Sequence, residues 1–151
     1  MTYVQASNLS PSLNKLKMLE KFTSNPTKLF IIDGLGAILS AFLLGYVLDK
    51  FENIFGIPSK TLYTLAAMPV FFAFYDLYCI RNKKDDLGHF MKGIAIMNLT
   101  YCCISILFAF YHLGTITIFG WSYLIIEILI IIILTIIEYK VAIRLIKKAN
   151  T

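Results

Sequence analysis

The sequence predicts an all-α membrane protein in which four transmembrane helices form an antiparallel bundle. Hydrophobic residues make up 58% of the chain and charged residues 15%, whereas soluble domains have about 25% charged residues. Four stretches are apolar over about the 20 residues that a helix needs to cross the hydrocarbon core of a bilayer. The basic residues gather between these stretches. A chain of 151 residues is also of a size that favours a single domain.

Residues 1–28 are predicted to form a basic cytoplasmic segment. In the stretch SPSLNKLKMLEKF, Ser10 can cap a helix that has Pro11 at its first position. Apolar side chains then recur every three residues, at Leu13, Leu16, Leu19 and Phe22. Two interpretations stay open, namely a short amphipathic helix on the inner leaflet and a basic tail without fixed structure. Asn25-Pro26 is expected to mark the break before the first span.

The predicted spans cover residues 29–48, 61–80, 93–113 and 119–137, within a transmembrane domain of residues 29–140. Helices are expected because a backbone in lipid must satisfy its hydrogen bonds internally, and the stretch LIIEILIIIILTII lacks the alternation of a strand. Short connections make consecutive helices antiparallel neighbours. Residues 141–151 form a basic cytoplasmic tail, into which the fourth helix is expected to extend.

Basic residues at the ends of the spans predict the orientation in the membrane. Of the 14 Lys and Arg residues, all except Lys50 and Lys60 lie before the first span, between the second and third, or after the fourth. The positive-inside rule therefore places both termini in the cytoplasm. No small-residue cleavage site follows the first apolar stretch, so we expect this stretch to remain as an anchor. The bias toward Ile, Lys and Asn suggests an AT-rich bacterial gene, and hence the bacterial inner (plasma) membrane.

Polar residues within and at the ends of the spans form a candidate intramembrane site. Its members are Asp33, Asp76, Asn98, His112 and Glu127. At 100° per residue, Asp33 borders a face of small residues on the first helix, and Asn98 and His112 share a polar stripe on the third. At 1.5 Å per residue, Asp33, Asp76 and Asn98 lie about 6–10 Å below the inner boundary, and Glu127 lies about 10 Å from the outer one. An ionised acid costs about 2.5–3.5 kcal/mol at the centre of a membrane helix, so these acids must face inward, pair or be protonated.

The inner acids, Asp33 and Asp76, have a structural and a functional interpretation. In the structural one they pair at headgroup level with basic residues, namely Lys28, Arg81 or Lys92. In the functional one they form, together with Asn98, a pocket that faces the cytoplasm and holds a cation, a proton or a polar headgroup.

The outer acid, Glu127, has no basic residue of the chain at its depth. His112 is its nearest predicted partner, and Tyr63 or Tyr46 can bond to a neutral, protonated Glu127. A proton or cation site and an interhelical polar lock are both compatible with this position.

The sequence predicts no catalytic residues, no metal and no cofactor. It contains no Gly-rich phosphate loop, HExxH, CxxCH or Ser/His/Asp arrangement. His89 and His112 lie at opposite ends of the third helix, and His112 with Glu127 supplies too few ligands for a metal. Three cysteines are interpreted as small apolar packing residues: Cys79, Cys102 and Cys103. The net charge of +5 is explained by the orientation of the spans, so no nucleic-acid partner is expected.

Three function classes remain, in order of preference. The first is a structural or accessory subunit, the second is a small proton- or cation-coupled transporter or channel that acts as an oligomer, and the third is a membrane enzyme acting on a lipid or quinone. The preferred class has no enzymatic activity. Since four short helices enclose little volume, a homo-oligomer or a partner membrane protein is expected within the lipid bilayer. No motif carries a resemblance to a known family.

Overall fold

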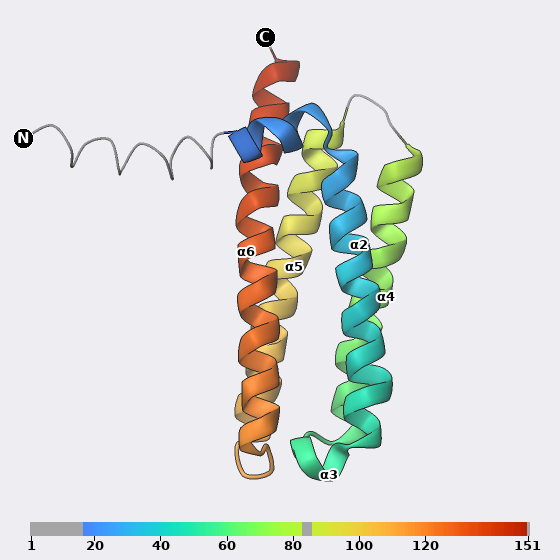
Figure 1. Ribbon diagram of the computed structural model, residues 1–151, viewed down its shortest axis with the longest axis vertical. Coiled ribbons are helices and arrows are strands. Elements are labelled where there is room, and N and C mark those ends of the chain that lie inside the picture. The colour runs from blue at the N-terminus through green and yellow to red at the C-terminus, as the bar shows by residue number, and fades with distance from the viewer. Residues whose placement is uncertain (1–16, 83–85, 151) are drawn as a thin grey trace, which may run out of the picture.

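The computed structural model describes residues 17–82 and 86–150, and all regular structure in these ranges is helical (Figure 1). Four helices are long and apolar enough to cross a membrane. They are α2 (Thr27–Phe42) with its continuation η1 (Leu43–Leu48), α4 (Ser59–Arg81), α5 (Leu87–Tyr111) and α6 (Ile118–Ala149). A single turn of helix, α3 (Glu52–Phe55), connects η1 to α4. The all-helical class and the four spans predicted from the sequence are therefore confirmed.

Two of the spans begin or end well beyond the predicted limits. α5 begins at Leu87 instead of residue 93, and α6 continues to Ala149 instead of ending near residue 137. The extension of α6 was expected from the basic tail. Its 32 residues correspond to about 48 Å at 1.5 Å per residue, which exceeds the ~30 Å of hydrocarbon. The hydrophobic pattern marks the part of a helix that lies in lipid, whereas polar residues continue the same helix beyond it.

Residues 17–24 are helical and lie across the end of the molecule where α6 also ends (Figure 1). Leu19 is buried and Phe22 packs against the hydrophobic core, whereas Lys17 and Lys21 are exposed. This arrangement agrees with the amphipathic helix predicted for this segment. The predicted cap at Ser10 and Pro11, and the apolar positions Leu13 and Leu16, lie outside the described residues.

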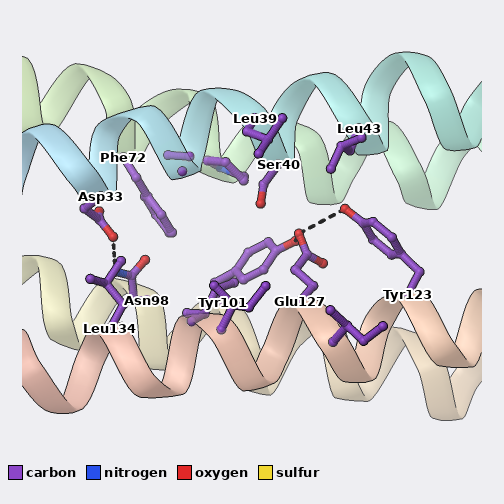
Figure 2. A pocket seen from close by; sticks show the side chains of 16 residues that line it. Asp33, Leu39, Ser40, Leu43, Phe72, Asn98, Tyr101, Tyr123, Glu127 and Leu134 are labelled. Atoms are coloured by element: carbon purple, nitrogen blue, oxygen red, sulfur yellow. Dashed lines mark hydrogen bonds between the residues drawn. The ribbon is translucent and has the colours of Figure 1, made fainter.

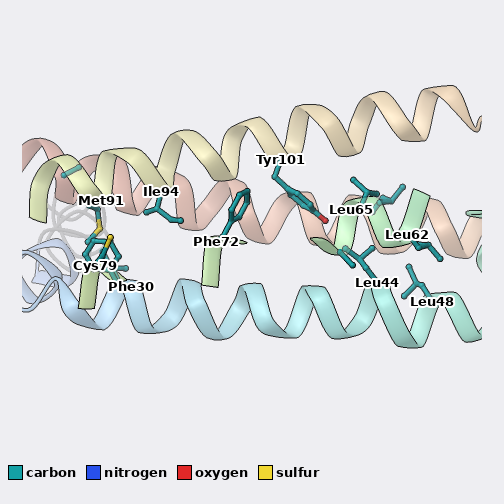
Figure 3. Packing of buried hydrophobic residues seen from close by; sticks show 14 of the residues in the cluster. Phe30, Leu44, Leu48, Leu62, Leu65, Phe72, Cys79, Met91, Ile94 and Tyr101 are labelled. Carbon is teal, nitrogen blue, oxygen red and sulfur yellow. The ribbon is translucent and has the colours of Figure 1, made fainter. Parts of the chain in front are cut away.

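The spans pack as two close pairs, α2 with α4 and α5 with α6, and α4 and α5 share a smaller contact (Figure 1). Glycines permit the close approach within each pair. A Cβ at Gly34 of α2 would lie 3.4 Å from the Cβ of Asp76 on α4, and one at Gly88 of α5 would lie 2.7 Å from Cγ1 of Ile146 on α6. Buried apolar side chains fill the interior from Met91 at one end to Leu48 at the other (Figure 3).

The outward surface of the spans is strongly apolar. Exposed leucine, isoleucine and phenylalanine side chains occur on all four, including Leu35, Phe71, Leu107 and Ile130. An apolar surface of this extent is unusual for a protein in water and is typical of one that contacts lipid. The fold thus indicates an integral membrane protein.

The loops at the end opposite the C-terminal end of α6 are tied together. The amide of Thr117 donates to the carbonyl of Phe55 at 3.1 Å, and the Thr117 hydroxyl donates to the carbonyl of Ile54 at 2.5 Å. Gly56 has a φ of 68°, and a Cβ there would lie 2.0 Å from the carbonyl oxygen of Thr115. We call the contact between residues 54–56 and 115–117 the loop clasp. It closes this end of the molecule.

Candidate intramembrane site

An inner cluster of polar groups forms where all four spans meet. It consists of Asp33 from α2, Asp76 from α4, Asn98 from α5 and Glu138 from α6, and all four side chains are buried. The Asn98 amide nitrogen donates to Oδ1 of Asp33 at 2.8 Å and to Oε2 of Glu138 at 3.3 Å. One amide thereby joins acids from two different helices.

Asp76 is the most isolated member of this inner cluster. It is 1% exposed, and neither of its carboxyl oxygens has a hydrogen-bond partner among the described residues. Oδ2 of Asp33 and Oε1 of Glu138 are likewise buried without a partner. The cluster holds three acids and one amide donor, which reaches only Asp33 and Glu138, so acceptors outnumber donors unless the carboxyl groups themselves carry protons.

The outer acid, Glu127, lies on α6 and faces α2 (Figure 2). Its Oε1 atom accepts hydrogen bonds from the hydroxyl groups of Tyr101, at 3.1 Å, and Tyr123, at 3.3 Å. Its Oε2 atom is buried and has no partner among the described residues. The hydroxyl of Ser40 on α2 points toward this carboxyl group (Figure 2).

The partners predicted for Glu127 are wrong. Nε2 of His112 lies 2.9 Å from the hydroxyl of Thr61 on α4, and Tyr63 donates to Asp49 at 2.8 Å. His112 is the C-terminal cap of α5, where the chain leaves helical geometry, so its direction no longer follows the stripe of that helix. These residues lie at a similar predicted depth in the bilayer to Glu127, but depth does not determine the direction in which a side chain points.

The predicted pairing of the inner acids with basic residues is also contradicted. In the described part of the chain, Asp33 and Asp76 form no ion pair with Lys28, Arg81 or Lys92. The one ion pair found there joins His89 and Asp86 at the surface. Lys28 is exposed in the first turn of α2, whereas Asp33, further along the same helix, is buried.

Outside the spans, the first loop at the clasped end has its own polar contacts. The Ser59 hydroxyl donates to Glu52 at 2.5 Å. The nearby hydroxyl groups of Ser59 and Tyr63 hold the pKa of the Asp49 carboxyl below its usual value, and Tyr63 donates to Asp49 at 2.8 Å. Since Asp49 lies at the end of η1 and Tyr63 lies on α4, this contact helps to fix the turn between the first two spans.

A cavity of about 230 Å³ lies between α2 and α6 (Figure 2). Asp33 and Asn98 line it at one end, and Glu127 and Tyr123 line it at the other. The wall between them is apolar apart from the hydroxyl groups of Ser40 and Tyr101. Its other residues are Gly36, Ala37, Leu39, Leu43, Pro69, Phe72, Ile126, Ile130, Ile131 and Leu134. The cavity thus connects the outer acid with the inner cluster.

The cavity reaches the lipid-facing surface between α2 and α6. Three of its lining residues are also more than half exposed on the outside of the molecule: Leu39 at 57%, Ile126 at 58% and Ile130 at 61%. α2 and α6 form neither of the two close pairs, so the space between them is not filled by their own side chains. A molecule in the bilayer can therefore approach the cavity from the side.

Three contributors to the site were not among its predicted members, namely Glu138, Tyr101 and Tyr123, although helical spacing places Tyr101 on the same polar stripe as Asn98. Glu138 lies near the basic tail, a position typical of an interfacial residue, and Tyr123 resembles a member of the outer aromatic belt. The spacing of residues along α6 nevertheless indicated both Glu138 and Tyr123. Glu138 follows Glu127 by eleven residues, or about three turns, and Tyr123 precedes it by four, so all three share one face of α6.

Metal coordination has no support from these clusters, because no group of three His, Cys, Asp or Glu side chains in the described ranges could hold an ion. Cys79 and Cys102 are buried, Cys103 is exposed, and all three thiols are free. In comparisons with known proteins, no family model, no curated protein and no solved structure matches the chain.

Proposed function

We propose that the protein is a small membrane transporter that moves protons, and exchanges them for a cation, by way of two layers of buried carboxyl groups. The observation that carries this proposal is the cavity that touches both layers, together with the Oε2 atom of Glu127, which is buried and has no hydrogen-bond partner in the described part of the chain. A buried carboxylate without a basic partner is costly, so such a group favours the protonated state or a bound cation. Proton and cation then compete for one position.

The proposed architecture is an antiparallel four-helix bundle in the bacterial inner membrane, with both termini in the cytoplasm. Twelve of the 14 basic residues support this orientation by the positive-inside rule. The inner cluster then lies in the cytoplasmic half and the loop clasp faces outward. A membrane-impermeant thiol reagent applied to intact cells should label Thr115→Cys but not Asn150→Cys. The reverse pattern would mean that the bundle has the opposite orientation in the membrane.

The accessory-subunit class has less support than the transporter. An acid that serves only to lock helices together would be expected to have its hydrogen-bonding groups satisfied and to leave no cavity beside it. Glu127 and Asp76 each have buried oxygens that form no hydrogen bond with any described residue, and Glu127 borders a cavity. The enzyme class has no observation of its own, because its acid and base would be the same Asp33 and Glu127 that line the cavity.

Proton flux in proteoliposomes tests the proposed function. Vesicles that contain the purified protein and an internal pH indicator receive a pH gradient, in a medium with sodium, potassium and small alkylammonium ions. We expect the double variant Asp76→Asn, Glu127→Gln to reduce proton flux at least about tenfold, because both layers then lose a carboxyl group. Both substitutions nearly preserve side-chain size.

The matched control for this experiment is Glu20→Gln, which makes the same chemical change at an exposed position outside the spans. It should retain the flux of the wild-type protein. Circular dichroism and size-exclusion chromatography in detergent establish that each variant is folded. Equal flux for the folded double variant and the wild-type protein, or no flux above that of protein-free vesicles, would exclude the transporter.

A further inference from the structure

We infer that the cavity between α2 and α6 binds a small organic cation, with an apolar body of about one ring and a single ammonium group that meets Glu127. This inference rests on the proposed function, because it names the class of cation that takes the place of the proton. It is argued from the charge, the lining, the size and the opening of the cavity.

The charge of the ligand follows from the hydrogen bonds of Glu127. Both tyrosine hydroxyl groups donate to Oε1, and they hold the carboxyl group in place without occupying Oε2. Glu127 is 7% exposed and lines the cavity, so Oε2 is a buried, unpartnered acceptor beside an open space. No Lys or Arg occurs among the described residues of the lining. An ammonium group supplies the positive charge that an ionised Glu127 lacks.

The rest of the lining favours an organic cation over a metal ion. Alkali and alkaline-earth ions need several oxygen ligands around them, whereas most of this cavity is lined by aliphatic and aromatic side chains. Phe72 and Tyr101 present rings that meet edge to face, with centroids 6.3 Å apart. Aromatic faces within about 6 Å attract ammonium groups, and the aliphatic wall accepts the apolar part of the ligand.

The volume limits the body of the ligand to about one ring. Cavities of about 150 Å³ with apolar walls bind benzene. The 230 Å³ available here leaves room for a ring and a small substituted ammonium group. A polycyclic cation would not fit without a change in the distance between α2 and α6.

The opening explains how such a ligand reaches a site inside the bilayer. An amphipathic cation gathers at the membrane interface, where its apolar part is in lipid and its charge is near water. From there it passes between Leu39 and Ile130, which border the cavity and are exposed at the surface. When it binds at Glu127, one proton leaves the carboxyl group for water, so the charge of the site is unchanged.

Binding of benzyltrimethylammonium to the purified protein in detergent tests this inference. Its charge is permanent, so a pH dependence reports on the protein. We expect saturable binding that becomes weaker as pH falls, by up to about tenfold per pH unit where one proton is exchanged for one cation. Glu127→Gln should weaken binding at least about tenfold, and Glu20→Gln should leave it unchanged. Neopentylbenzene, in which carbon replaces the nitrogen, should bind equally to both variants.

A second pair of variants blocks the cavity without touching the carboxyl group. A Cβ at Gly36 would meet nothing within 4 Å, and Gly36 lines the cavity, so Gly36→Leu can place its side chain in that space. We expect it to abolish benzyltrimethylammonium binding. Gly114→Leu makes the same change in the loop after α5, where a Cβ also meets nothing within 4 Å, and should not affect binding.

The outcomes separate this inference from the proposed function. Equal binding by wild-type protein, Glu127→Gln and Gly36→Leu would mean uptake by the micelle and would overturn the inference. Tighter binding of neopentylbenzene than of the cation by the wild-type protein would overturn it as well. If proton flux nevertheless depends on Glu127 and Asp76, the transporter stands and its cation is of another class.

Discussion

At the scale of single residues, Asn98 has the most demanding role in the structure. Its amide nitrogen donates to Asp33 and Glu138, and no other donor in the described residues reaches these two acids. The amide therefore fixes the relative positions of α2, α5 and α6 at the inner cluster. Asp76 can occupy its position because Gly34 has no side chain and so leaves room for the carboxyl group of Asp76.

Asn98→Leu should destabilise the folded protein by about 2–5 kcal/mol, since two hydrogen bonds to acids are lost and two carboxyl oxygens lose their donor. Unfolding in mixed detergent, followed by circular dichroism, measures the change. Asn53→Leu is the matched control at an exposed position of α3 and should have an effect near zero. A similar stability for both variants would mean that the inner cluster does not hold the helices.

The sequence was sufficient to predict inward positions for Asp33 and Asn98, but not that Glu138 joins them or which partner each acid has. Helical spacing placed Asp33 and Asn98 on inward faces, and they are in contact. It could not show that α6 approaches α5 closely enough for Glu138 to reach Asn98, because that depends on which helices are neighbours. Tyr123 was missed for a similar reason, since an interfacial tyrosine and a hydrogen-bond donor to Glu127 have the same sequence signature.

At the scale of elements, the two ends of the spans differ. α5 begins earlier than predicted and α6 extends beyond the apolar stretch, so both helices continue past the apolar part of the spans at the end where α6 terminates. At the other end, η1 continues α2 as a π-helix, and Leu43 at its start lines the cavity. Short π-helical segments occur frequently at functional sites. Neither the π-helix nor the loop clasp has a hydrophobic pattern of its own, so hydropathy could not predict them.

Gly56→Ala should destabilise the loop clasp. The φ of 68° at Gly56 is unfavourable for alanine, and the added Cβ would overlap the carbonyl oxygen of Thr115. We expect a loss of about 1–3 kcal/mol and faster amide hydrogen exchange at Thr117, which donates to Phe55 across the clasp. Gly114→Ala is the control, since a Cβ there is unobstructed. Unchanged exchange at Thr117 in Gly56→Ala would contradict a closed outer end.

At the scale of the whole molecule, the two close helix pairs leave a loosely packed boundary between α2 and α6, and the cavity lies along this boundary. The cavity therefore connects the outer acid, the inner cluster and the surrounding lipid. The sequence predicts the number of spans and the apolar character of their outward surface, because both follow from the favourable transfer of apolar side chains from water into lipid. The position of a cavity depends on which pairs of helices pack closely, and a single sequence contains little information about this pairing.

Infrared difference spectroscopy of the carboxyl stretch tests the central claim most directly, namely that a proton exchanges at Glu127 beside this cavity. Spectra of the wild-type protein and Glu127→Gln are recorded in membranes across a pH titration, in water and in heavy water. We expect a protonated-carboxyl band that shifts in heavy water, diminishes as pH rises and is absent from Glu127→Gln. Identical spectra for both proteins throughout the titration would contradict it.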